Sequence, residues 1–98
     1  MARTKPFDAA EYLDSPEAIA AYLSEAFETN DAAFVTEALG TVARARGMTA
    51  VAKETGLSRE NLYKALSSEG RPEFVTVMKV LDTLGVQLHA EAKASKVA

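Results

Sequence analysis

The side chains best suited to chemistry lie close together, and the chemistry that they suggest is the recognition of DNA bases. Four polar residues are spaced so that they share one face of a helix: Arg59, Glu60, Tyr63 and Lys64. Arginine binds guanine through two parallel hydrogen bonds, and glutamate accepts one from the amino group of cytosine. Tyr63 would meet a thymine methyl group or a phosphate, and Lys64 a guanine or a phosphate.

This face belongs to a longer stretch, 48–67, that has the pattern of a helix-turn-helix. Ala52 is small, where two crossing helices approach closely. Gly56 permits the left-handed backbone of a tight turn. Leu57 would fill the space beneath the turn, and Ser58 would cap the second helix by accepting hydrogen bonds from free amides.

In a helix-turn-helix the second helix enters the major groove, and the helix ends approach the phosphates. We therefore expect base contacts from the exposed face of the second helix and phosphate contacts from Thr49 and Ser67. An αα-hairpin packed only for stability, with a solvated charged face, is the alternative. The residues predicted to bind DNA are Thr49, Ser58, Arg59, Glu60, Asn61, Tyr63, Lys64 and Ser67.

Two helices are predicted ahead of this motif. The first begins at Ser15 and Pro16 and ends near Asn30; its buried face is formed by Ile19, Leu23, Ala26 and Phe27. Asp31 caps the second, and Gly47 ends it. Its expected buried stripe is Phe34, Val35, Ala38, Leu39 and Val42.

The motif itself supplies helices over about Thr49 to Thr55 and from Ser58 to about Ser67. A fifth helix ends at Gly85, and its expected core residues are Phe74, Val77, Met78, Leu81 and Leu84. The fold class predicted from these patterns is all-α.

After Gly85 the pattern changes to alternation, with apolar residues at 86, 88 and 90. A short C-terminal strand over Val86–Ala90, paired with a second subunit, and a coil or ragged helix end are both open. The predicted organisation is a single domain, 1–98. It divides into an N-terminal arm and helix (1–30), a helix-turn-helix core (31–85) and a possible strand and tail (86–98).

The charge of the chain excludes a protein that coats DNA without specificity, because its 98 residues carry a formal charge of −3. The charge is unevenly distributed. Residues 1–46 carry net −4, whereas the stretch from Arg44 to Arg71 carries net +3. The acidic first part fits a basic protein partner, or simply a solvated surface that keeps the protein in solution.

Other classes of function find little support in the sequence. The chain has no cysteine, so a disulfide framework and a thiolate metal site are excluded. His89 is the only histidine, and we expect no catalytic residue, no metal site and no cofactor. No secretory segment or membrane span is evident, which makes the cytoplasm the expected compartment.

Beyond these patterns, the chain resembles a known family. The region of the second to fifth helices resembles the Xre, or lambda-repressor-like, helix-turn-helix fold. The stretches FDAAEYLDSPEAIAAYL, ALGTVARARGMTAVAKETGLSRENLYKALSSEG and FVTVMKVLDTLGVQL resemble addiction-module antidote proteins, the HigA-like antitoxins of bacterial and prophage toxin–antitoxin loci. The likeness covers about residues 7–90, and Ala65 departs from it by being small where a larger aliphatic residue is usual.

The resemblance implies a homodimer that represses transcription by binding a palindromic operator in its own promoter. It also implies a complex with a small toxin of the RelE/HigB type, an mRNA-cleaving ribonuclease. Carried over by position, the base-reading residues would be Arg59, Glu60 and Lys64. A stand-alone prophage-type regulator, and a toxin-binding module with little DNA binding, are the alternatives.

Overall fold

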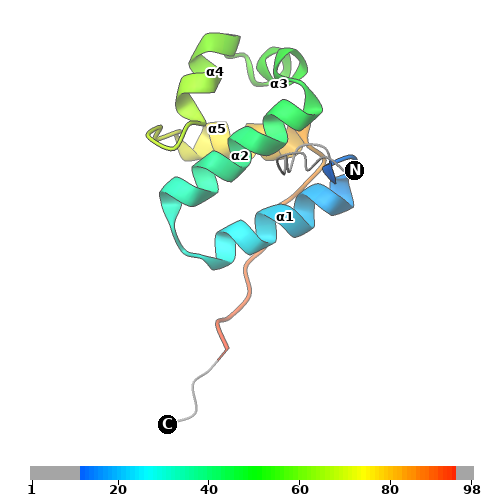
Figure 1. Cartoon of the computed structure of the whole chain (residues 1–98), viewed down its shortest axis with the longest axis vertical. Helices are drawn as coiled ribbons and strands as arrows, with labels where there is room; N and C mark the ends of the chain where they lie inside the picture. Colours follow the sequence, from blue (N-terminus) through cyan, green and yellow to red (C-terminus); the bar gives the residue numbers. More distant parts are fainter. Residues whose placement is uncertain (1–11, 95–98) are drawn as a thin grey trace, which may run out of the picture.

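Five α-helices make up the regular structure of the chain in a computed structural model that describes residues 12–94. They are α1 (Pro16–Glu28), α2 (Ala32–Arg46), α3 (Met48–Thr55), α4 (Arg59–Ala65) and α5 (Phe74–Thr83) (Figure 1). The all-α prediction is confirmed for this part of the chain. None of its helices has both the length and the apolar character that a bilayer crossing requires.

Local capping determines where the first two helices begin, as the sequence predicts. The hydroxyl of Ser15 accepts a hydrogen bond from the amide of Ala18 at 3.1 Å, directly before Pro16. A carboxylate oxygen of Asp31 accepts from two amides of the first turn of α2, at 3.1 and 3.2 Å. Between the helices Asn30 adopts a left-handed conformation with φ 56°, which asparagine tolerates better than most residues.

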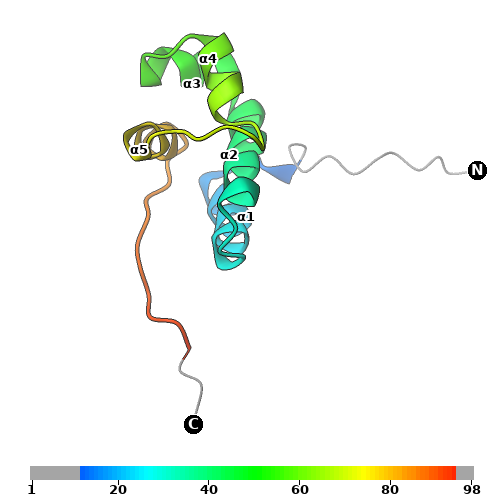
Figure 2. The ribbon, with the colours of Figure 1, turned by 90° about the vertical axis from the view of Figure 1, so that its left-hand side faces the viewer.

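The core is formed by all five helices, with α2 and α3 at its centre. α2 packs against α1 and α3, and α3 packs in turn against α4 and α5. Figures 1 and 2 show α3 and α4 together at one end of the molecule, while residues 86–94 run from α5 towards the other end. The largest fully buried side chains are Leu23, Leu39, Leu62, Leu81, Leu84, Val42, Val51 and Val80.

Four aromatic or sulfur-containing residues that the periodicity assigns to the core are exposed. Phe74 is 68% exposed, Phe34 47%, Met78 44% and Phe27 37%. The prediction of their burial is wrong because helical spacing shows that residues share a face, not how far the neighbouring helices cover it. On α5 the covered face is centred on Val80, Leu81 and Leu84, so the first turn of the helix projects past it.

The possible C-terminal strand is also absent from the described residues, because 86–94 have no regular secondary structure. The amides of Gly85 and Val86 donate to the carbonyls of Asp82 and Leu81, at 3.1 and 3.0 Å, and so close the end of α5. The alternation is followed in part, since Val86 and Leu88 pack against the core while Gln87 and His89 are exposed, but Ala90 is exposed as well. The described fold has no neighbouring strand with which this segment could pair.

Candidate nucleic-acid interface

The turn between α3 and α4 has the geometry predicted for it. Gly56 has φ 79°, in the left-handed region, and its amide donates to the carbonyl of Ala52 at 2.9 Å. Leu57 is half-buried against the core beneath the turn. The hydroxyl of Ser58 accepts from the amide of Asn61 at 3.0 Å, so the cap of α4 is formed. These contacts hold the two short helices at a defined angle.

A buried threonine, which the sequence reasoning did not identify, supports the same turn. Thr55 is 5% exposed, and its hydroxyl donates to the carbonyl of Ala52 at 3.2 Å. The same oxygen accepts from the amide of Leu57 at 3.5 Å, a long contact. A hydroxyl-bearing residue directly before a glycine that ends a helix is the local signal for this role.

A second missed residue, Gly40, controls how closely the end of α4 approaches α2. A Cβ atom at this position would lie 2.5 Å from the carbonyl oxygen of Leu66. Leu66 itself is 3% exposed and Leu62 is fully buried, so the inner face of α4 is anchored in the core. The absence of a side chain at Gly40 lets α4 pack tightly while its other face stays in solvent.

That outer face brings together four of the predicted residues, Arg59, Glu60, Tyr63 and Lys64. All are exposed, and Tyr63 retains 44% of its surface. The guanidinium of Arg59 lies over the ring of Tyr63, 6.0 Å from its centroid, one helical turn away. This distance is at the limit for a cation–π interaction. The stacked pair leaves the guanidinium facing solvent at the start of α4.

The other four predicted residues are exposed too, but their roles differ. Asn61 lies on the flank of α4, about 100° around the helix from Glu60. The hydroxyl of Ser58 is engaged in the cap, and that of Ser67 donates to the carbonyl of Lys64 at 3.0 Å. Thr49 lies in the first turn of α3, where Gly47 provides no side-chain cap. The first amides of α3 therefore have no side-chain capping partner.

The electrostatics of the described chain divide along the sequence. From residue 12 to residue 43 there are six acidic side chains and no Lys or Arg, and all six are exposed. From Arg44 to Arg71 there are six Lys and Arg against three acidic residues, and all six cations are exposed. α3 and α4 carry three Lys and Arg side chains against two acidic ones, and Arg44 and Arg46 lie just before them, whereas α1 and the part of α2 before Arg44 carry only acidic ones. A polyanion is favoured at the first surface and repelled at the second.

Within residues 12–94 no group of three His, Cys, Asp or Glu side chains lies close enough to hold a metal ion. His89, the only histidine, is exposed. The arrangement is therefore one of hydrogen-bond donors, an aromatic ring and charges on a rigid helix face. These groups can recognise the edges and phosphates of a duplex.

Comparison with known proteins identifies the family to which the chain is similar. Residues 3–92 match the sequence model of a family described as "Probable addiction module antidote protein". An uncharacterized protein of Haemophilus influenzae (strain Rd) is 47% identical over 87 residues, which span 89% of this chain and 90% of that protein. No solved structure matches the chain.

Proposed function

Because this chain belongs to the family of probable addiction module antidote proteins, we propose that it is an antitoxin that also represses its own promoter. It neutralises a small toxin of the RelE/HigB type and binds an operator as a homodimer of helix-turn-helix domains. The family supports the antitoxin role and a toxin partner. Operator binding rests on the residues of α3 and α4.

The observation that carries the DNA-binding part is the exposed polar face of α4 on an anchored helix. Leu62 and Leu66 are buried on one side, and Arg59, Glu60 and Lys64 face solvent on the other. A recognition helix needs this combination, because base readout requires side chains held within a fraction of an ångström by the packing behind them. Thr49 and Ser67, near the helix ends, take the phosphate contacts in this proposal.

The net charge of −3 defines how such a protein binds DNA. Few phosphates are neutralised, so non-specific affinity is low and most of the discrimination comes from base contacts. Dimerisation compensates for the small number of phosphate contacts, since a dimer binds two half-sites one helical turn of DNA apart at once. The same charge favours the alternative, a toxin-binding module with little affinity for DNA, and the experiment separates the two.

The test is a fluorescence anisotropy titration with the DNA upstream of the gene and with a scrambled duplex of equal length. Wild-type protein is expected to prefer the upstream DNA. Lys64→Ala is expected to lose affinity, whereas Lys79→Ala, which removes an exposed cation from α5, is the matched control. Equal affinity for the two duplexes would remove the repressor role and leave the toxin-binding module.

A further inference from the structure

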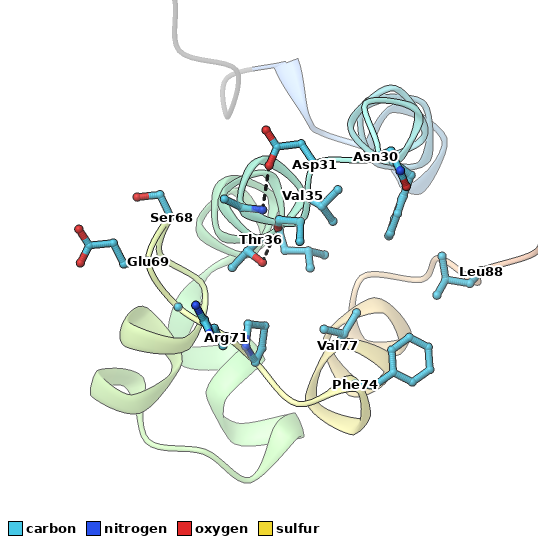
Figure 3. Close-up of a pocket in the computed structure, with 16 residues that line it drawn as sticks. Asn30, Asp31, Val35, Thr36, Ser68, Glu69, Arg71, Phe74, Val77 and Leu88 are labelled. Atoms are coloured by element: carbon cyan, nitrogen blue, oxygen red, sulfur yellow. Dashed lines mark hydrogen bonds between the residues drawn. The ribbon is translucent and has the colours of Figure 1, made fainter.

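An apolar groove of about 870 Å³ lies between the start of α2, the loop from α4 to α5 and the start of α5. The C-terminal segment contributes Leu88 to it (Figure 3). Its volume lies within the range of about 300–1,000 Å³ that is usual for binding sites. The large apolar side chains that line it are Phe27, Val35, Leu39, Phe74, Val77 and Leu88.

Two of the exposed aromatic side chains lie in the lining of this groove. Phe74 and Phe27 both line it, and they are 68% and 37% exposed. Large apolar side chains that gather around a hollow and remain in solvent mark a surface that another molecule covers. A partner that inserts apolar side chains here would bury Phe74, the most exposed of the large hydrophobic residues described.

The charges around the groove define the chemistry of that partner. Asp31 and Glu69 stand at its edge (Figure 3), and Arg71 is the one cation among the residues described as lining it. Asp31 is one of six exposed acidic side chains in residues 12–43, a stretch that supplies α1 and most of α2 and contains no Lys or Arg. An occupant with apolar anchors and basic flanks is therefore favoured. A second copy would bring two such acidic surfaces together.

The groove and the proposed DNA surface are separate. None of the eight residues predicted to contact DNA lines the groove. It opens instead beside the start of α2, whereas α3 follows the end of that helix (Figure 1). A partner confined to the groove therefore covers none of these eight residues, although the groove reaches Ser68, the neighbour of Ser67.

We infer that this groove is where a basic toxin docks, inserting apolar side chains against Phe74 and Leu88 while its cations face the acidic surface. The inference rests on the proposed function for the existence of the toxin, and it adds the surface and the chemistry of the contact. The probe is the purified protein encoded by the reading frame adjacent to this gene. Its binding to the full chain is measured by isothermal titration calorimetry.

Two substitutions place a charge in the groove, Phe74→Glu on α5 and Leu88→Glu on the C-terminal segment. Each is expected to weaken binding by about tenfold or more, as for a residue at the centre of an interface. Phe34→Glu is the matched control, because Phe34 is an exposed phenylalanine of α2 that does not line the groove. It is expected to leave the affinity within about twofold. Thermal melts confirm that each variant is folded.

A second pair of substitutions tests the charge. Asp31→Asn removes a carboxylate while asparagine still caps α2, and Glu69→Gln removes the other. Together they are expected to weaken binding about two- to fivefold at low salt, and to reduce its dependence on salt. Unchanged affinity in these variants would contradict the acidic contact.

The outcomes separate this inference from the proposal on which it rests. If the wild-type chain binds the protein from the adjacent reading frame and both groove variants bind it as tightly, the groove is not the docking site, and the antitoxin role stands. If the wild-type chain does not bind it, the toxin part of the proposed function fails, and the inference with it. If Leu88→Glu, which lies outside α5, instead turns a dimer into a monomer by sedimentation, a second copy occupies the groove and the inference is overturned.

Discussion

At the scale of single residues, Gly40 has the clearest consequence for stability. Its missing side chain leaves room for the carbonyl oxygen of Leu66, 2.5 Å from where a Cβ atom would lie. Backbone cannot move aside cheaply, so Gly40→Ala is expected to lower the free energy of unfolding by about 1–3 kcal/mol. Urea denaturation of both proteins measures this change in the free energy of unfolding. Helix propensity alone predicts instead that Gly40→Ala raises the free energy of unfolding by about 1 kcal/mol. That result would contradict the close approach of Leu66 to Gly40.

Also at this scale, the stacking of Arg59 on Tyr63 makes a prediction about DNA binding. The guanidinium of Arg59 lies over the ring of Tyr63, one helical turn further along α4, at 6.0 Å from the ring centroid. Tyr63→Ala is therefore expected to cost about 0.5–1 kcal/mol of operator affinity. Tyr63→Phe keeps the ring and is expected to bind as the wild type does, in the same anisotropy titration. Equal losses in both variants would show that the hydroxyl, not the ring, matters.

At the scale of elements, the start of α2 depends on one carboxylate. Asp31 accepts hydrogen bonds from the amides of Ala33 and Phe34. Asp31→Ala is expected to lower the free energy of unfolding by about 0.5–2 kcal/mol, whereas Asp31→Asn retains a capping oxygen and nearly all of the stability. Chemical denaturation of both variants checks this. A loss as large for asparagine would indicate that charge rather than capping stabilises the helix.

The same helix ends show what the sequence can predict. Ser15, Asp31 and Ser58 each act on amides two or three residues away, and Gly56 ends its helix by its own φ angle. Such signals are local, so the five helices could be placed to within a few residues from sequence alone. The exposed face of α4 followed from the same periodicity once Leu62 was taken to be buried.

Tertiary packing accounts for the features that the sequence could not provide. Phe74 and Met78 share a helical face with Leu81, yet only Leu81 is covered, because the buried face of α5 is centred on Val80, Leu81 and Leu84 near the end of the helix. The contact of Gly40 with Leu66 joins residues far apart in the chain. Of the two possibilities left open after Gly85, a coil is observed, because a strand would need a partner that the described fold does not supply. The groove is lined by three separate stretches of the chain, 27–39, 68–77 and Leu88, so it has no local signal in the sequence.

At the scale of the whole molecule, the chain presents two surfaces of opposite character. The stretch that forms α1 and most of α2 is acidic and contributes Asp31 to the groove, whereas six Lys and Arg side chains lie between Arg44 and Arg71, on and beside α3 and α4. The net charge of −3 averages over both and hides them. A protein built in this way can hold a basic partner and an operator at different places, so that toxin and DNA need not compete for one surface.

The proposed dimer concerns the whole molecule, and α5 offers a candidate surface for it. Val75 and Met78 are 59% and 44% exposed, and neither lines the groove. We expect the wild type to sediment as a dimer at micromolar concentration, and Val75→Glu with Met78→Glu to sediment as a monomer with weaker operator binding. A wild-type monomer under these conditions would contradict the dimer.

The central claim is that α4 reads bases, and a base-pair scan tests it directly. The upstream duplex is altered one symmetric pair at a time, and affinities are measured for the wild type and for Arg59→Ala. We predict that the wild type loses about 1–3 kcal/mol when one G·C pair is replaced, and that Arg59→Ala no longer distinguishes that pair. If both proteins respond identically at every position, Arg59 does not read a base and the account is contradicted.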